Sequence, residues 1–216
     1  MKLLVTAGPT REHLDPVRFL SNRSTGKMGF AVARAAAVRG HQVTLVAGPV
    51  SLPTPAGVRR IDIVSACDLL TAVKRRLRFA DALVMTAAVA DWRPASVSPV
   101  KLKKRGMSRV LALEPNPDVL QTIRPCKGTR LFVGFAAETG DPVREAERKL
   151  RTKGLDLIVA NDVSRPDSGF AVDTNKVTFL SLANDSLERL DLPLLTKDEV
   201  AERLVEWLEQ KQCEEV

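Results

Sequence analysis

The segment FAVARAAAVRGHQVTLV at residues 30–46 contains two successive patterns. Its alanine-rich part, residues 30–39, favours a helix, and Gly40 provides a residue type at which helices commonly end. The apolar run at residues 42–46 is typical of a short buried strand. A helix followed closely by a buried strand predicts an α/β protein.

The same alternation continues on both sides of this segment. The pattern predicts further helices over residues 65–78, 117–123, 142–153 and 196–210. It predicts buried strands over residues 3–6, 81–86, 131–135 and 155–160, and a hairpin of residues 176–182 and 186–192. We therefore expect one domain over residues 1–216, with a Rossmann-like, mostly parallel sheet, helices on both faces and a C-terminal β-hairpin.

Two of the predicted helices begin with recognisable capping residues. Ser65 is the expected N-cap of the 65–78 helix, with Asp68 as the acidic residue of its first turn. Asn116 is the expected N-cap of the next helix, with Pro117 at the first helical position, where a missing N–H costs nothing.

Two stretches interrupt the alternation. A long loop is expected between the first strand and the first helix. Residues 92–109 contain two prolines and a basic run, and we expect them to form a protruding arm. A strand is expected to follow at residues 110–113.

The composition narrows the function classes. The chain has 216 residues, a net charge of +7 and only 4% aromatic residues. A basic chain suits nucleic acid, an anionic membrane surface or a multiply phosphorylated small substrate. The scarcity of aromatic side chains weighs against nucleic acid, since bases usually stack on them.

The sequence also indicates where the protein is located and whether it has disulfides or a structural zinc site. No apolar run approaches the ~18 residues that span a bilayer, and the run at residues 3–5 is too short for a signal peptide. We therefore expect a cytoplasmic protein. The three cysteines are isolated in the sequence, which disfavours a disulfide framework and a structural zinc site.

Small residues follow several of the predicted strands, at residues 8–10, 87–91, 136–139 and 161–162. Ligands of parallel sheets bind at the carboxyl ends of the strands. Each segment alone is consistent with an ordinary tight turn, but four together predict a cleft that a ligand approaches closely.

Residues 24–29, Ser-Thr-Gly-Lys-Met-Gly, lie at the start of the first helix. A Walker A loop needs Ser or Thr after the lysine, where Met28 stands, and a GxGxxG fingerprint needs Gly where Ser24 stands. Free N–H groups at a helix N-terminus still suit a phosphate, which is our preferred interpretation. Capping by Ser24 or Thr25 is the alternative.

Charged residues supply further candidates. Lys101 and Lys103 would share one face of an extended segment and could close over a triphosphate, although a flexible basic loop explains them equally well. By spacing alone, Lys149 and Lys153 fit solvated helix charges, with Glu145 as a partner for Lys149. Asp91 suits substrate, Mg²⁺ or a turn. No Ser/His/Asp or Cys/His arrangement is evident.

Eight blocks in order resemble bacterial phosphopantothenoylcysteine synthetase, the phosphopantothenate–cysteine ligase of coenzyme A biosynthesis. They occupy residues 8–12, 14–19, 21–29, 87–92, 101–104, 116–118, 133–139 and 156–162, and the resemblance extends over about residues 3–210. Trp92 stands where the family often has Tyr, and Thr25 where it often has Ser; each replacement keeps size or a hydroxyl.

The resemblance implies a reaction in two steps. The carboxylate of 4′-phosphopantothenate attacks the α-phosphate of CTP, which gives an acyl-cytidylate and pyrophosphate. The amine of L-cysteine then displaces CMP and forms an amide. Mg²⁺ is expected to accompany the triphosphate. The resemblance also implies a homodimer with sites shared through the arm, and a flavin-dependent decarboxylase as a fused half or separate subunit.

The resemblance also assigns roles to residues. Asn22 is expected to handle the acyl-cytidylate and Lys101 to contact the triphosphate, and both are our catalytic candidates. Arg18, Asn22, Ala87 and Ala88 are the expected substrate contacts. The expected nucleotide-binding residues are Gly8, Ser24, Gly26, Gly29, Met85, Thr86, Ala87, Asp91, Lys101, Pro117, Asp118, Val119, Leu120, Phe135, Lys149, Lys153 and Asn161.

Two alternatives remain open from the sequence. One is an ATP-using version of the same ligase, because the spacing does not reveal how the base is read. The other is a Rossmann-type oxidoreductase, which the missing GxGxxG weakens. It is also weakened by Ala47 and Gly48, which stand where such enzymes carry an acidic residue after the second strand.

Overall fold

A computed structural model of the chain describes residues 1–104, 110–138, 142–163, 167–183 and 186–214. Its main sheet has eight strands in the order β12-β11-β10-β9-β6-β1-β4-β5. They are β1 (Lys2–Ala7), β4 (Gln42–Ala47), β5 (Arg59–Asp62), β6 (Ala82–Met85), β9 (Leu131–Glu138), β10 (Leu157–Asp162), β11 (Thr174–Ala183) and β12 (Ser186–Thr196). The six strands from β10 to β5 are parallel, whereas β11 and β12 form the predicted antiparallel hairpin.

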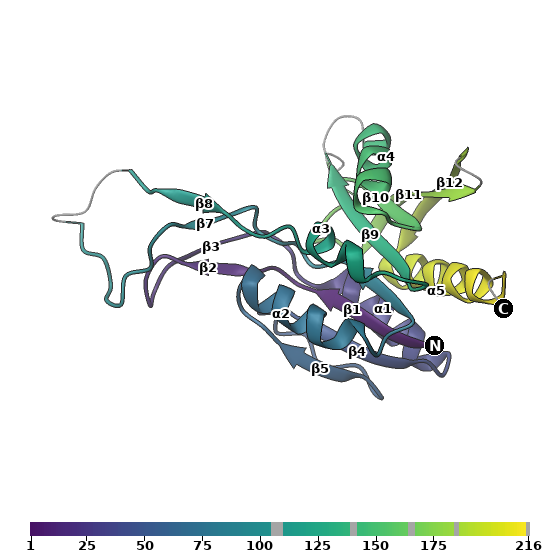
Figure 1. The fold of residues 1–216 in the computed structure, drawn as a ribbon, viewed down its shortest axis with the longest axis horizontal. Helices are drawn as coiled ribbons and strands as arrows, with labels where there is room; N and C mark the ends of the chain where they lie inside the picture. The colour runs from purple at the N-terminus through teal and green to yellow at the C-terminus, as the bar shows by residue number, and fades with distance from the viewer. Residues whose placement is uncertain (105–109, 139–141, 164–166, 184–185, 215–216) are drawn as a thin grey trace.

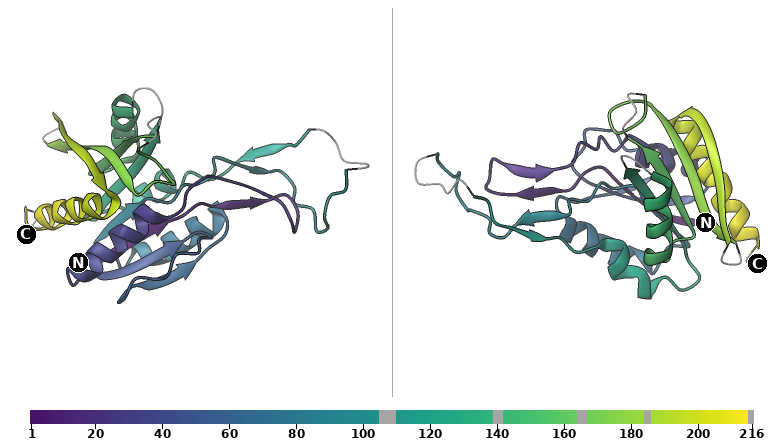
Figure 2. Two further views of the ribbon diagram at one scale, coloured as in Figure 1. Left: turned by 180° about the vertical axis from the view of Figure 1, so that it is seen from behind. Right: turned by 90° about the horizontal axis from the view of Figure 1, so that it is seen from above.

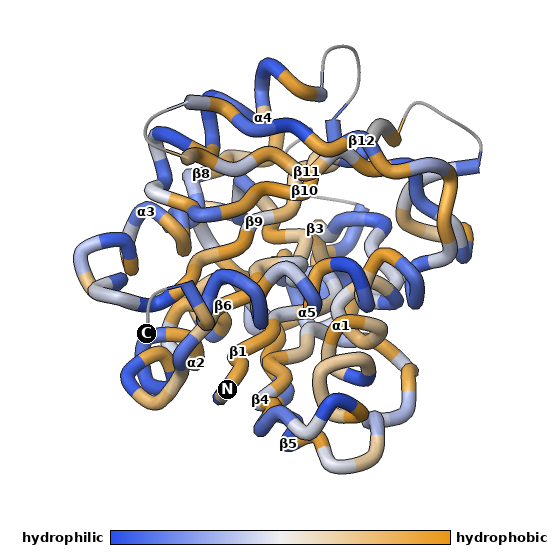
Figure 3. The backbone as a smooth tube through the Cα atoms, turned by 90° about the vertical axis from the view of Figure 1, so that its right-hand side faces the viewer, coloured by the Kyte–Doolittle hydropathy of each residue, from blue (hydrophilic) through white to orange (hydrophobic). Residues whose placement is uncertain are grey.

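Helices cover both faces of this sheet, as the alternating pattern predicts (Figures 1 and 2). On one face α1 (Lys27–Val38) and α5 (Lys197–Glu214) bury the apolar side chains of alternate strand residues. On the other face lie α2 (Ala66–Leu77), α3 (Val119–Ile123), which leads into the 3-10 turn η1 (Arg124–Cys126), and α4 (Pro142–Lys153). Figure 3 shows hydrophobic residues concentrated along the central strands. None of the helices in the described ranges combines the length and apolar composition needed to cross a bilayer.

The two predicted caps have different outcomes. At α2 the Ser65 hydroxyl accepts from the N–H of Asp68, and the Asp68 carboxylate accepts from the N–H of Ser65, which confirms the capping box. At α3 the prediction is wrong by two residues, because Asp118 is the N-cap and accepts from the N–H of Gln121 at 3.0 Å. The Asn116 side chain instead donates to the Ala90 carbonyl at 2.8 Å, which ties this turn to the segment between β6 and β7.

The arm is larger than predicted. It contains two antiparallel ribbons, β2 (Arg11–His13) with β3 (Phe19–Ser21) and β7 (Trp92–Pro94) with β8 (Leu113–Pro115). They project side by side from the sheet (Figure 1). The expected long loop after β1 therefore contains a hairpin, and the strand expected at 110–113 begins only at Leu113 and pairs with β7. Residues 105–109 of the predicted arm lie outside the described residues.

Both ribbons start from neighbouring central strands, which explains why they stay together. The segment after β1 pairs with the segment after β6: Ala88 N–H donates to Gly8 O at 2.9 Å, and Thr10 N–H donates to Ala88 O at 3.2 Å. The fully buried Thr10 hydroxyl then accepts from the N–H of Ala90 at 3.0 Å. The arm thus begins at the carboxyl edge of the sheet, beside the expected site.

Candidate functional site

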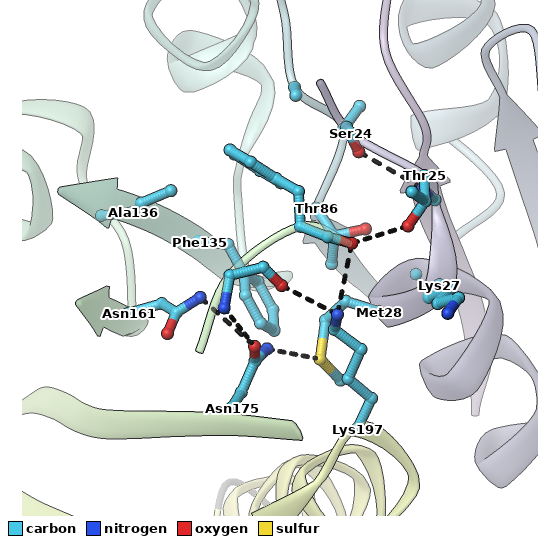
Figure 4. A pocket seen from close by; sticks show the side chains of 17 residues that line it. Ser24, Thr25, Lys27, Met28, Thr86, Phe135, Ala136, Asn161, Asn175 and Lys197 are labelled. Atoms are coloured by element: carbon cyan, nitrogen blue, oxygen red, sulfur yellow. Dashed lines mark hydrogen bonds between the residues drawn. The ribbon is translucent and has the colours of Figure 1, made fainter. Parts of the chain in front are cut away.

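A first cavity of about 150 Å³ opens at the carboxyl ends of the central strands, beside the N-terminus of α1 (Figure 4). The turn after β6 and the ends of β9 and β10 form its inner wall, and the segment before β11 forms its outer wall. The residues that line it are Ser24, Thr25, Gly26, Lys27, Met28, Gly29, Thr86, Ala87, Ala88, Phe135, Ala136, Ala137, Asn161, Gly169, Phe170, Asn175 and Lys197.

The N-terminus of α1 faces this cavity without a capping side chain. Its N-cap is Gly26, whose φ of 80° lies in the left-handed region that favours glycine. Ser24 accepts only from the N–H of Gly26, at 3.3 Å, and the Thr25 hydroxyl donates to the carbonyl of Phe170 at 2.8 Å. The capping alternative is therefore wrong. The N–H groups of the first turn and the helix dipole remain available to an anion.

Gly29 allows α1 to pack closely on the sheet. A Cβ atom at this position would lie 2.3 Å from Thr86 Oγ1 and 2.5 Å from Ala7 Cβ. Thr86 is itself held by a 2.5 Å hydrogen bond from its hydroxyl to the carbonyl of Thr6. Gly29 thus shapes the site through close packing of helix and strands.

Buried amides form the rear of the first cavity. Asn161 Oδ1 accepts from the Ser168 hydroxyl at 2.6 Å, and Asn175 Oδ1 accepts from the N–H of Gly169 at 3.3 Å. The Asn161 amide also donates to Asn175 Oδ1 at 3.5 Å. These bonds link the end of β10 to the segment that forms the outer wall.

A second cavity of about 220 Å³ lies on the other side of the 87–91 turn. Ala87 and Phe135 line both cavities, so the two spaces meet at these residues. The second cavity is lined by Met85, Ala87, Val89, Ala90, Asp91, Asn116, Pro117, Asp118, Val119, Leu120, Phe135 and Lys153. The structure therefore divides most of the predicted nucleotide-binding residues between two adjoining spaces, whereas Gly8, Lys101 and Lys149 line neither of them.

The two lysines of α4 are not solvated helix charges. Lys153 Nζ lies 3.1 Å from Asp118 Oδ2 and lines the second cavity. Lys149 pairs directly with Glu138 at the end of β9, and the predicted partner Glu145 is more distant, at 3.9 Å. Both side chains are about three-quarters buried, so their interpretation as solvated helix charges is wrong, whereas the expected pairing of Lys149 with Glu145 is present as the longer of its two contacts.

The predicted catalytic residue Asn22 lies between the arm and the first cavity. Its amide donates to the Ala88 carbonyl at 3.0 Å, and Ala88 lines that cavity. Gly8 lies beside the N-cap of α1, since a Cβ added to Gly26 would approach Gly8 Cα to 3.4 Å. The blocks at residues 8–12, 21–29 and 87–92 thus come together in space.

Arg18 and Lys101 lie on the arm and line neither cavity of their own chain. Arg18 binds the buried carboxylate of Asp15, and its Nη2 also donates to the Leu102 carbonyl at 2.9 Å. The geometry places the two predicted residues close to each other and apart from the other candidates.

Several lining residues of the first cavity were absent from the sequence-based candidates, among them Lys27, Phe170, Asn175 and Lys197. Lys27 directly follows Gly26 in the motif at the start of the first helix, so the sequence could have identified it as a site residue. Asn175 and Lys197 carry no motif, and they reach the cavity only through the packing of β11 and α5. Within the described ranges, no group of three or more His, Cys, Asp or Glu side chains is placed to hold a metal ion.

The chain is similar to known proteins over most of its length. Residues 1–212 match the family described as DNA/pantothenate metabolism flavoprotein C-terminal domain. The chain is 44% identical to the coenzyme A biosynthesis bifunctional protein CoaBC of Escherichia coli K12, over 95% of the chain and 51% of that protein. It is 45% identical to the protein of the same name from Bacillus subtilis 168, over 92% and 48% respectively.

A solved structure extends the comparison to the fold. The crystal structure of the C-terminal domain of a CoaBC protein superposes with a TM-score of 0.82 at 41% identity, covering 99% of this chain and 98% of that one. The chain spans about half the length of the curated relatives it matches. A family match over nearly the whole chain, with a fold that agrees, places the protein in the DNA/pantothenate metabolism flavoprotein C-terminal domain family.

Proposed function

We propose that the chain is a phosphopantothenate–cysteine ligase that uses CTP. The observation that carries this proposal is the pair of cavities that meet at Ala87 and Phe135. A reaction that joins a phosphorylated acid to a nucleotide needs two anion-binding spaces with a shared boundary. The CoaBC relatives, described as bifunctional proteins of coenzyme A biosynthesis, support the same reaction.

The first cavity suits 4′-phosphopantothenate. The uncapped N-terminus of α1 would receive the phosphate, because its N–H groups and dipole favour a dianion. Met28, Phe135 and Phe170 offer apolar contacts to the rest of the molecule. The carboxylate at the far end of the substrate would then reach the boundary at Ala87.

The second cavity suits the nucleotide. Lys153 lines it and Lys149 lies nearby on the same helix, so both could contact phosphate oxygens once these displace Asp118 and Glu138. Mg²⁺ that arrives with a triphosphate needs only one or two protein carboxylates, and the exposed Asp91 at this cavity is able to supply one. Pyrophosphate leaves as the substrate carboxylate bonds to the α-phosphate.

The second step replaces the bond to CMP by an amide bond. The neutral amine of L-cysteine attacks the acyl carbon, CMP leaves with the bonding electrons, and the amine loses a proton. Negative charge develops on the acyl oxygen during the attack, and the Asn22 amide, next to Ala88, is placed to donate to it. Positioning and charge neutralisation carry such a reaction without a protein nucleophile.

We further propose that the active unit is a homodimer. Arg18 and Lys101 would complete the site of the partner chain, because on their own chain they lie on the arm. The arm exposes apolar side chains that a second copy would cover, namely Val17, Phe19, Trp92, Val97, Val100 and Leu113. The chain spans about half the length of a bifunctional relative, and the family resemblance implies a decarboxylase domain or subunit as a functional partner.

Pyrophosphate release by the purified protein tests the proposal. Release should require both a nucleotide and 4′-phosphopantothenate, and CMP and the amide should appear only after L-cysteine is added. A panel of CTP, ATP, GTP and UTP identifies the nucleotide, and preference for ATP would support the alternative version of the ligase. No release with any nucleotide, together with a saturable change in NADH fluorescence, would favour an oxidoreductase instead.

A further inference from the structure

One buried cation at the first cavity has no role in the reaction as proposed. Lys197, the first residue of α5, is only 6% exposed, and it lines the cavity next to the N-terminus of α1 (Figure 4). Burial, reinforced by the nearby Lys27 ammonium, lowers the pKa of Lys197 to about 8. The side chain is therefore still mostly charged at neutral pH.

The ammonium group of Lys197 is fully engaged by backbone carbonyls. It donates to Gly169 O at 2.8 Å, to Phe170 O at 3.4 Å and to Val172 O. An ammonium has three donors, and within the described ranges all of its hydrogen bonds go to residues 168–173, which we call the wall loop. A bound phosphate would have to break one of these bonds to contact Lys197 directly.

The wall loop also receives bonds from α1. The Thr25 hydroxyl donates to Phe170 O at 2.8 Å, and Lys27 Nζ contacts Ala171 O at 3.5 Å and Asp173 Oδ1 at 2.6 Å. Phe170 O thus accepts from both Thr25 and Lys197. Because Gly169 and Phe170 line the cavity, the position of this loop sets the shape of the outer wall.

We propose that Lys197 is a positioning residue that holds the wall loop against the N-terminus of α1, so that the first cavity is preformed for the phosphorylated end of its substrate. This inference rests on the proposed function for the identity of that substrate. Three carbonyl oxygens turn toward one ammonium, and in a trans peptide the following N–H groups, those of residues 170, 171 and 173, point the opposite way. Loss of the ammonium would remove this donor from the carbonyls of Gly169 and Val172 and leave Phe170 O with the Thr25 hydroxyl, which would loosen the loop.

Lys197→Met tests the proposal, because methionine keeps an unbranched side chain that is one heavy atom shorter and removes the three donors. We expect the KM for 4′-phosphopantothenate to rise about tenfold or more, since hydrogen bonds to charged groups are among the stronger ones. The KM for the nucleotide should stay within about twofold of the wild type, because the second cavity does not contact Lys197. Lys197→Arg keeps the charge and should restore most of the binding. Lys211→Met, at a half-buried position near the other end of the same helix, is the matched control.

Hydrogen–deuterium exchange provides a readout that does not depend on activity. Amides of the wall loop should exchange about tenfold faster or more in the ligand-free Lys197→Met protein than in the wild type or in Lys211→Met. If the wild type releases no pyrophosphate, the proposed function fails, and the exchange result alone decides whether Lys197 holds the loop. Unchanged exchange in Lys197→Met overturns the inference, and so does an equal rise in both KM values. Failure of Lys197→Arg to restore binding also overturns it.

Discussion

The carboxylate of Asp15 and the guanidinium of Arg18 form the central contact of the arm. Asp15 Oδ2 lies 2.5 Å from Arg18 Nη2 and also accepts from the N–H of Leu102 at 3.2 Å. Its other oxygen accepts from the N–H groups of Val17 and Arg18, both at 2.8 Å. The Asp15 carboxylate thus joins the two ribbons one residue away from Lys101.

This contact predicts a pH-dependent contribution to stability. The Arg18 side chain, followed by backbone N–H donors, holds the pKa of Asp15 well below its usual range. A depressed carboxyl pKa stabilises the fold above its unfolded pKa of about 4 and loses that effect as the pH falls toward the folded value. We expect Asp15→Asn to lower Tm at pH 7, and the gap from the wild type to narrow below about pH 4.

Thermal melts from pH 7 to pH 3 check this expectation. Glu202→Gln, an exposed carboxylate on α5, should follow the wild type across the series. Parallel curves for the wild type and Asp15→Asn down to pH 3 would show that the ionised carboxylate contributes nothing to the fold.

Asn22→Asp should separate the two steps of the reaction. The substitution replaces an amide donor next to Ala88 by a carboxylate, which would repel the charge that develops on the acyl oxygen. We expect unchanged nucleotide binding, measured by calorimetry, and amide formation reduced by about a hundredfold or more, within the range found for single oxyanion donors. Equal losses in nucleotide binding and amide formation would remove Asn22 from this role.

Lys101→Gln should slow the first step. Removing one cation near a triphosphate weakens the neutralisation of charge on the leaving pyrophosphate. Single-turnover pyrophosphate release should fall by about tenfold or more, whereas the melting temperature should not change, because Lys101 is exposed. Release at the wild-type rate would place Lys101 outside the site.

Mixing two impaired variants tests whether the site is shared between chains. Lys101→Gln removes an arm residue and Asn22→Asp removes a residue of the cavity side. A heterodimer would contain one site with both defects and one with neither. After subunit exchange at equal amounts, half of the dimers are mixed, so about a quarter of the wild-type activity should return. No recovery, despite mixed dimers in native mass spectra, would mean that both residues serve the site of their own chain.

The fold was predictable where patterns are long enough to be periodic. The helix and strand at residues 30–46, the Ser65 cap of α2 and the β11–β12 hairpin follow from local sequence. The three-residue strands of the arm did not, because three residues cannot show an alternation, and their pairing partners lie as far away as Trp92 and Pro115. The prediction for Asn116 was wrong because its side chain binds the segment between β6 and β7 instead of capping α3.

The residues of the candidate site were likewise predictable only where a local motif contains them. Ser24, Gly26, Ala87 and Phe135 were found because they lie in motifs at strand ends or at the start of a helix. Lys197 was missed because its partners, such as Gly169, lie 28 residues earlier in the chain, and only tertiary packing brings them together. Sequence spacing also misjudged Lys149, whose partner Glu138 lies on a strand and not on its own helix.

Gly29→Ala should destabilise the protein through overpacking. The added methyl carbon would lie 2.3 Å from Thr86 Oγ1, 2.5 Å from Ala7 Cβ and 2.9 Å from Thr6 O, so α1 would have to move away from β1 and β6. Forcing a methyl group into a packed interface typically costs about 1–3 kcal/mol, more than the gain of up to ~1 kcal/mol in helix propensity from Gly to Ala. Urea denaturation measures the difference, with Val38→Ala, at an 82% exposed position of the same helix, expected to stay within about 0.5 kcal/mol of the wild type. The movement of α1 would also shift the N–H groups of its first turn. We therefore expect the variant to bind 4′-phosphopantothenate more weakly, measured at temperatures where it is fully folded. A Gly29→Ala protein as stable as the wild type would show that α1 can move away from the strands at no cost, and that this close packing does not fix the first cavity.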